Sequence, residues 1–145
     1  CKKCTELGID GLIIPDLPLE IFENEYKSIF EKYGLKNIFL ITPQTGLNRI
    51  KQIDMLSDSF IYMVSSASIT GSQEGFGQVQ MDYFKQINSL NLQNPQIIGF
   101  GIKDAQTFSQ ATQYQKGAIV GSAFITYLKN NSLETIDQFV LNLKP

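Results

Sequence analysis

Short apolar runs alternate with longer amphipathic stretches along the whole chain, and this alternation constrains the fold more than any other feature. The apolar runs are residues 11–14, 38–41, 60–64, 97–98 and 118–120. Each run has the length of a buried strand, and the stretches between them carry apolar residues at three- and four-residue steps, which is helical spacing. This order predicts β/α units built around a parallel sheet.

Helices are expected over residues 20–33, 47–56, 79–90, 104–114 and 133–143, with a short helix beginning near Gly121. Residues before Gly8 resemble the last turn of another helix. Thr45, Asp104 and Ser132 are expected to cap helix N-termini, because a side-chain oxygen there can accept a hydrogen bond from a free backbone N–H. Gly34 suits the end of the first long helix.

Composition limits the class of protein. With 145 residues, of which 43% are hydrophobic, residues 1–145 are expected to form a single domain with its own core. The 12 basic and 14 acidic residues nearly balance, and Arg49 is the only arginine, which argues against nucleic acid as a partner. No apolar run approaches the roughly 20 residues of a membrane span. No signal peptide is visible, so we expect a cytoplasmic protein.

Two further absences bear on chemistry. The chain has no histidine, which removes the commonest general base and metal ligand. Its two cysteines, Cys1 and Cys4, fall where a helix is expected, and no second pair accompanies them, so we expect no metal site. The chain also begins at Cys1 rather than at methionine, apparently inside a helix, which suggests a fragment.

Five β/α units fit two architectures. One is an open, doubly wound sheet of the flavodoxin type, and the other is part of a (β/α)8 barrel, which needs eight strands. Glycine placement favours the partial TIM barrel, because the glycine-rich strand ends follow the last two strands. In barrels a phosphate site is frequently built from the loops after the last two strands and the N-terminus of a short helix.

Three glycine-containing turns follow consecutive strands: Thr70-Gly71, Gly99-Phe100-Gly101 and Gly121-Ser122. Backbone N–H groups at a helix N-terminus can bind a phosphate without lysine, and glycine lets the anion come close. A single glycine at a strand end usually marks only a turn. Three glycine-containing turns at the ends of consecutive strands favour phosphate binding.

Other residues at the strand ends have two interpretations each. Phe100 is either an apolar wall of a ligand site or a core residue that caps the barrel, and Tyr62 either lines a pocket or fills a barrel layer. Asp16 is either an active-site carboxylate or, as we favour, a turn residue that caps the next helix. We find no convincing pair of carboxylates on strand ends, so the chain shows no general acid–base machinery.

Four segments together resemble the tryptophan synthase α subunit: residues 13–18 (Ile-Ile-Pro-Asp-Leu-Pro), Tyr62-Met63-Val64-Ser65 leading to Thr70-Gly71, Gly99-Phe100-Gly101-Ile102, and Gly121-Ser122-Ala123. Their order and spacing match throughout, and the resemblance covers essentially the whole chain. It implies barrel strands four to eight of a (β/α)8 barrel. It also implies cleavage of indole-3-glycerol phosphate to indole and glyceraldehyde 3-phosphate, without a cofactor. The indole passes to a β subunit that carries pyridoxal phosphate.

The resemblance assigns roles to individual residues. Backbone donors to the phosphate would come from Gly71, Gly101, Gly121 and Ser122. The indole pocket would be lined by Phe100, Gly99, Ile13, Leu40 and Tyr62. Thr70 would hydrogen-bond an aspartate when substrate binds.

The chain departs from the family in two respects. The catalytic glutamate and its partner aspartate lie on earlier strands, so the chain alone is expected to be inactive. The family's loop usually reads Ser-Arg-x-Gly, whereas residues 65–68 read Ser-Ser-Ala-Ser, so Ser66 and Ser68 replace the arginine and the glycine. Two alternatives stay open: a non-catalytic phosphate-binding half barrel that associates with another copy, and a flavodoxin-like module that binds FMN.

Overall fold

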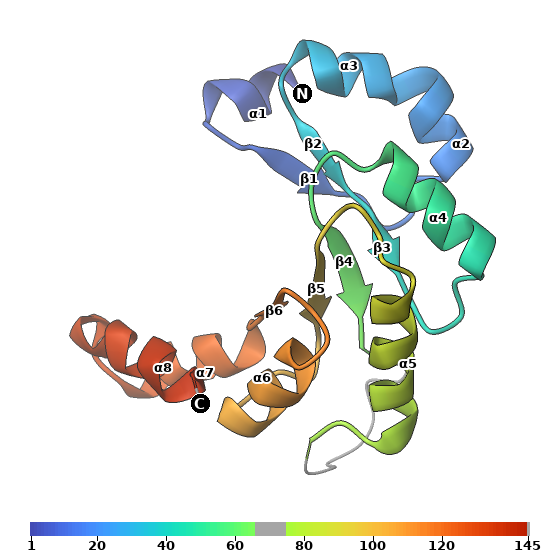
Figure 1. Cartoon of the computed structure of the whole chain (residues 1–145). Helices are drawn as coiled ribbons and strands as arrows, with labels where there is room; N and C mark the ends of the chain where they lie inside the picture. The colour runs from blue at the N-terminus through green and yellow to red at the C-terminus, as the bar shows by residue number, and fades with distance from the viewer. Residues whose placement is uncertain (66–74, 145) are drawn as a thin grey trace.

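The computed structural model describes residues 1–65 and 75–144, and Figure 1 shows the arrangement of the elements. The strands are β1 (Gly11–Ile13), β2 (Lys36–Ile38), β3 (Leu40–Ile41), β4 (Ile61–Val64), β5 (Gln96–Gly99) and β6 (Gly117–Ile119). The helical elements are α1 (Lys2–Glu6), α2 (Leu19–Ile21), the π-helical η1 (Phe22–Tyr26), α3 (Lys27–Lys32), α4 (Leu47–Leu56), α5 (Gln78–Ser89), α6 (Ala105–Thr112), α7 (Ser122–Asn130), the 3-10 turn η2 (Leu133–Thr135) and α8 (Ile136–Leu143).

All the strand pairs are parallel and follow the order of the sequence. β1 pairs with β2, and the second group runs β3-β4-β5-β6. Only Phe39 separates β2 from β3, and its carbonyl accepts a hydrogen bond of 2.8 Å from the Tyr62 N–H, so the two act as one bent strand. The flavodoxin-like alternative is therefore wrong, because that fold has the strand order 2-1-3-4-5.

The strands divide their side chains between two faces. Ile41, Ile61, Met63 and Ile98 are fully buried under the helices. The alternate residues turn to the other face, because successive side chains of a strand point to opposite sides. Figure 1 shows α3, α4, α5 and α6 along the outer side of the arc of strands, with the inner side open. The described residues thus form five β/α units of a barrel wall with an uncovered inner face.

The inner face is apolar and belongs to the candidate site. Register pairs Ile13 with Ile38 and Leu40 with Tyr62, and Tyr62 in turn with Ile97. Residues in register on parallel strands share a face, so these side chains form one surface across successive strands. Ile13 at its edge is 46% exposed.

The expected helices are confirmed, with two corrections. Thr45 does not cap α4: its hydroxyl accepts a hydrogen bond of 2.9 Å from the Thr42 N–H, and Gly46 occupies the N-cap. The helix expected over residues 20–33 contains the π segment η1. Phe22 and Phe30 both pack toward the strands, although eight residues in a regular α-helix leave them about 80° apart. The wider π turn removes much of that offset.

Within the described residues, no helix is both long and apolar enough to cross a membrane.

Asp54 at the end of α4 ties this helix to the connection that leads into β5. The residue is 7% exposed, and its carboxylate accepts hydrogen bonds from the backbone N–H groups of Gln93 (2.8 Å) and Asn94 (2.9 Å). The Asn94 amide also donates to the Asp54 carbonyl at 2.7 Å. The chain therefore enters β5 from a fixed position, and β5 carries the glycine turn of the candidate site.

We predict that Asp54→Ala lowers the free energy of unfolding by about 3 kcal/mol, because it removes a buried carboxylate that accepts hydrogen bonds from two backbone N–H groups, and bonds to a charged group are the stronger kind. Asp58→Ala is the matched control. Asp58 pairs with Lys36 at 2.7 Å, but both side chains are largely exposed, so its loss costs less than about 1 kcal/mol. Urea unfolding measures both values, and equal losses would contradict the role of Asp54.

Candidate functional site

The turn after β5 has an unusual backbone. Phe100 has φ +68° and Gly101 has φ +77°, so two consecutive residues occupy the left-handed region. For glycine this is easy, but for a bulky residue it costs about 1–3 kcal/mol. Phe100 is also 58% exposed, so it is not a core residue in this structure. A strained, exposed aromatic side chain at a strand end is typical of a binding site.

Tyr62 and Phe100 form an aromatic corner over Gly99. Their rings meet edge to face, with centroids 6.1 Å apart and planes at 65°. A Cβ built on Gly99 would overlap the Tyr62 hydroxyl and ring, so only glycine lets Tyr62 lie across β5. Burial raises the pKa of the Tyr62 phenol. The corner is an apolar surface with one neutral hydroxyl, and this favours pocket lining over barrel filling for Tyr62.

The turn after β6 lies beside the turn after β5. Gly99 of β5 pairs with Ile119 of β6. Gly101 comes two residues after Gly99, and Gly121 comes two residues after Ile119. Parallel neighbours lie about 4.8 Å apart, and the two turns therefore leave the same edge of the sheet. The structure thus brings together the expected phosphate-binding residues after β5 and β6.

The N-terminus of α7 suits an anion. Gly121 is its N-cap, no side chain caps it, and its first turn holds no acidic residue. Gly121 and Ser122 are exposed, and a Cβ built on Gly121 meets nothing within 4 Å. The unpaired N–H groups of a nine-residue helix and its dipole favour negative charge at this point.

The N-terminus of α6 differs, because a side chain already satisfies it. The Asp104 carboxylate accepts a hydrogen bond of 2.9 Å from the Thr107 N–H, and the Thr107 hydroxyl accepts one of 3.1 Å from the Asp104 N–H. This capping box confirms the expected role of Asp104. The hydrogen bonds from Thr107 hold the pKa of Asp104 below its ordinary value. A phosphate near both helices would therefore meet free donors at α7 and a carboxylate at α6.

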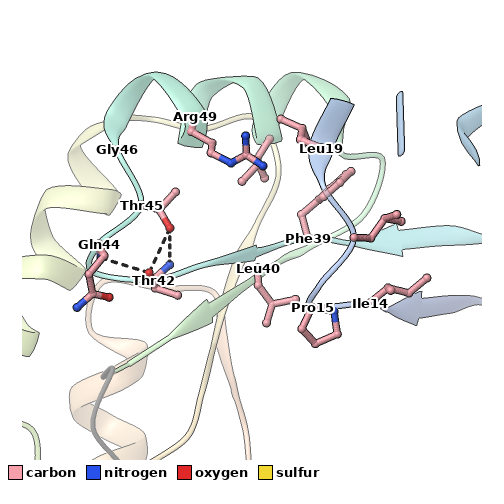
Figure 2. Close-up of a pocket in the computed structure, with 12 residues that line it drawn as sticks. Ile14, Pro15, Leu19, Phe39, Leu40, Thr42, Gln44, Thr45, Gly46 and Arg49 are labelled. Atoms are coloured by element: carbon pink, nitrogen blue, oxygen red, sulfur yellow. Dashed lines mark hydrogen bonds between the residues drawn. The ribbon is translucent and has the colours of Figure 1, made fainter. Parts of the chain in front are cut away.

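The expected pocket residues at the first strands are only partly brought together. Leu40 lines a pocket of about 310 Å³ whose lining also includes Ile14, Pro15, Thr42, Thr45 and Arg49, but neither Ile13 nor Tyr62. Figure 2 shows Leu40 and Pro15 on one side of this pocket and Thr42, Gln44 and Thr45 on the other. Hydrogen bonds join the three polar residues to one another. Arg49 is held by Glu20 at 3.2 Å.

Sequence reasoning missed the polar residues of this pocket. Thr42 and Gln44 follow an expected strand, and a signal was present in Arg49, the only arginine of the chain. Asp16 lies exposed in a turn closed by the Leu17 N–H and the Ile14 carbonyl at 3.2 Å. The turn interpretation of Asp16 is confirmed, but its capping role is wrong, because Pro18 is the N-cap of α2 and no side chain caps that helix.

Thr70 and Gly71, together with Ser66 and Ser68, lie outside the described residues. Their expected roles stay predictions.

Fold and site together define a protein of the TIM-barrel class. The described residues form five β/α units of such a barrel, and the candidate site lies at the carboxyl ends of the strands. The sequence family "Tryptophan synthase alpha chain" matches residues 1–143. The chain therefore belongs to the tryptophan synthase alpha chain family.

Individual relatives agree with this assignment. The tryptophan synthase alpha chain of Flavobacterium johnsoniae is 64% identical over 140 residues, which are 97% of this chain and 55% of that protein. That of Christiangramia forsetii is 60% identical over 144 residues, 99% of this chain and 56% of that protein. The chain thus spans about half the length of these relatives.

Solved structures give the same result. A mutant tryptophan synthase alpha-subunit from the hyperthermophile Pyrococcus furiosus superposes with a TM-score of 0.80 at 26% identity, covering 97% of this chain and 57% of that one. The alpha subunit from Campylobacter jejuni gives 0.74 at 31% identity, covering 98% and 56%. The expected barrel class is confirmed.

We predict that Asp104→Ala lowers the free energy of unfolding by about 1 kcal/mol at pH 7, as expected for the loss of an N-cap. Because the pKa of Asp104 is lowered in the folded state, this stabilisation is present above the ordinary aspartate pKa of about 3.9 and is lost as the pH falls through the folded-state pKa. The difference from wild type should therefore shrink between pH 5 and about pH 2 in urea unfolding. Asp104→Asn keeps an acceptor and is the control. If the difference in unfolding free energy between wild type and Asp104→Ala did not change with pH, the ionised Asp104 carboxylate would not be the stabilising cap.

Proposed function

We propose that this chain supplies the substrate-binding part of an enzyme that cleaves indole-3-glycerol phosphate to indole and glyceraldehyde 3-phosphate. The observation that supports this function most strongly is the pair of glycine turns after β5 and β6, which lie at one edge of the sheet beside an apolar inner face. Membership of the tryptophan synthase alpha chain family points to the same reaction.

The two ends of such a substrate need different surroundings, and the described residues offer both. The phosphate would bind the N-terminus of α7, at Gly121 and Ser122, and the neighbouring Gly101 amide. No described residue accepts a hydrogen bond from the Gly101 N–H. A dianion is stabilised there by backbone donors and the helix dipole without any lysine. The carboxylate of Asp104 disfavours the alternative position at α6.

The indole ring would lie against the apolar inner face. Ile13, Leu40 and Tyr62 share this face in the register of the strands, and Phe100 projects beside Tyr62. Aromatic rings prefer edge-to-face or offset contacts, and an indole placed beside this corner gains such contacts and loses exposed apolar surface. The distance between the two subsites then selects a substrate with a short linker between ring and phosphate.

The chemical step breaks the carbon–carbon bond between the indole ring and the glycerol phosphate. A retro-aldol cleavage needs groups that move protons at both fragments. We propose that the carboxylates which do so belong to the part of the relatives that this chain does not match. The indole product would pass to a β subunit as partner, and we expect the protein in the cytoplasm. Self-association through the uncovered inner face is an alternative for the chain on its own.

We predict that Gly121→Ala weakens binding of indole-propanol phosphate, an unreactive substrate analogue, by about tenfold, while it lowers the thermal stability no more than the same N-cap change does at Gly46. The added methyl group meets no protein atom within 4 Å, so it acts on an approaching anion rather than on the fold. Gly46→Ala is the matched control, because Gly46 is also a helix N-cap whose Cβ position is open. Isothermal titration calorimetry measures both affinities. Equal affinities in the two variants would count against a phosphate site at α7.

A chimera tests the activity itself. We predict that replacing the 140 matched residues of the Flavobacterium johnsoniae chain with those of this chain gives a protein that releases indole from indole-3-glycerol phosphate. The 145-residue chain alone should bind the analogue without turning over the substrate. A folded chimera that binds the analogue but releases no indole would contradict the proposed reaction.

A further inference from the structure

The left-handed turn at Phe100 and Gly101 is held from two sides by side chains for which the proposed function has no role. Ser65, which directly follows β4, contacts it on one side. Phe76, whose N–H is bound by Gln110 of α6, contacts it on the other. The turn would not keep its conformation through Phe100 alone, because a phenylalanine with positive φ is strained. The contacts that hold it therefore decide where the Phe100 ring and the Gly101 amide point.

Ser65 fixes the carbonyl side of the turn. It is only 2% exposed, and its hydroxyl donates a hydrogen bond of 2.9 Å to the Phe100 carbonyl. Its backbone N–H donates to the Gly99 carbonyl at 3.2 Å. Two successive carbonyls of the turn are thus bound to one residue. Rotation of the Phe100 peptide unit out of the left-handed region would break the hydroxyl bond inside a buried site.

Gln110 fixes the opposite side through Phe76. Its side-chain carbonyl accepts a hydrogen bond of 3.0 Å from the Phe76 N–H. The Phe76 ring packs edge to face on Phe84 with centroids 5.1 Å apart, and a Cβ built on Gly101 would lie 3.0 Å from this ring. The ring therefore leaves little room for a side chain at Gly101, where the positive φ also favours glycine. Gln110 lies on α6, the helix that follows the turn. Through Phe76, it therefore links α6 to the turn.

We propose, on the basis of the function proposed above, that Ser65 and Gln110 are positioning residues of the substrate site. Ser65 holds the Phe100 carbonyl and Gln110 holds Phe76 against Gly101. Together they aim the Phe100 ring at Tyr62, where the indole would bind, and the Gly101 amide at the phosphate. Neither side chain touches the substrate, and both act through the turn.

The test uses the 145-residue chain, labelled with ¹³C and ¹⁵N. Ser65→Ala removes the hydroxyl and Gln110→Leu removes the acceptor, whereas Gln110→Glu restores an acceptor for the Phe76 N–H. Two controls carry the same substitutions elsewhere. Ser57→Ala removes a hydroxyl that donates to the Ser59 carbonyl at 3.2 Å, and Gln113→Leu changes an exposed residue next to the end of α6. Nuclear Overhauser contacts between the Tyr62 and Phe100 rings report the turn directly, and calorimetry gives the affinity for indole-propanol phosphate.

Ser65→Ala and Gln110→Leu should lose the contacts between the two rings and bind the analogue about tenfold more weakly. Gln110→Glu and both controls should keep the contacts and stay within about twofold of wild type. The inference is overturned if Ser65→Ala and Gln110→Leu keep the ring contacts. It is also overturned if their affinity falls no further than that of a control with equal thermal stability. A wild-type chain that shows the ring contacts but binds no analogue would refute the proposed function, and the contacts in the variants would still decide the role of the two residues.

Discussion

The parallel pairing of β4, β5 and β6 is the constraint on which the rest of the structure depends. Val64 pairs with Gly99, and Gly99 pairs with Ile119, so the three strands end at one level. Because parallel strands all run the same way, each connection to the next helix leaves from the same edge, and chain segments far apart in the sequence meet there. A shift of one residue in β5 would turn Gly99 to the helix side and place a side chain against Tyr62. The aromatic corner, the left-handed turn and the adjacent α7 N-terminus all follow from this register.

The two helix N-termini after β5 and β6 differ in whether side chains cap them, and this difference separates a structural terminus from a candidate anion-binding one. At α6 an aspartate and a threonine satisfy the backbone donors, which stabilises the helix and repels an anion. At α7 a glycine leaves the same kind of donors free. The glycine forgoes the stability that a capping side chain would add, since an N-cap is worth about 1 kcal/mol. Such a difference between neighbouring helices is what a binding site at α7 requires.

Much of this arrangement could be predicted from the sequence. The β/α alternation, the cap at Asp104 and the partial barrel depend on local patterns, and the structure confirms them. The π segment η1 was not predictable, because it arises from packing Phe22 and Phe30 on the same strands. Thr45 was mistaken for a cap because its hydroxyl serves the Thr42 N–H in the preceding turn, which spacing alone does not distinguish. Ser65 and Gln110 were missed for a related reason: their partners, Phe100 and Phe76, lie 35 and 34 residues away.

The most direct test of a phosphate and indole site at the ends of β5 and β6 is a nuclear magnetic resonance titration of the 145-residue chain with indole-propanol phosphate, recorded on the backbone amides and the aromatic rings. If the account is correct, the largest shifts fall on the amides of Gly101, Ser122 and Ala123, with smaller shifts on the Tyr62 and Phe100 rings and little change at Ala105. Inorganic phosphate alone should shift the three amides but leave the rings unchanged. Shifts centred on α6, or spread over the lysines without saturation, would contradict a built site at this edge of the sheet.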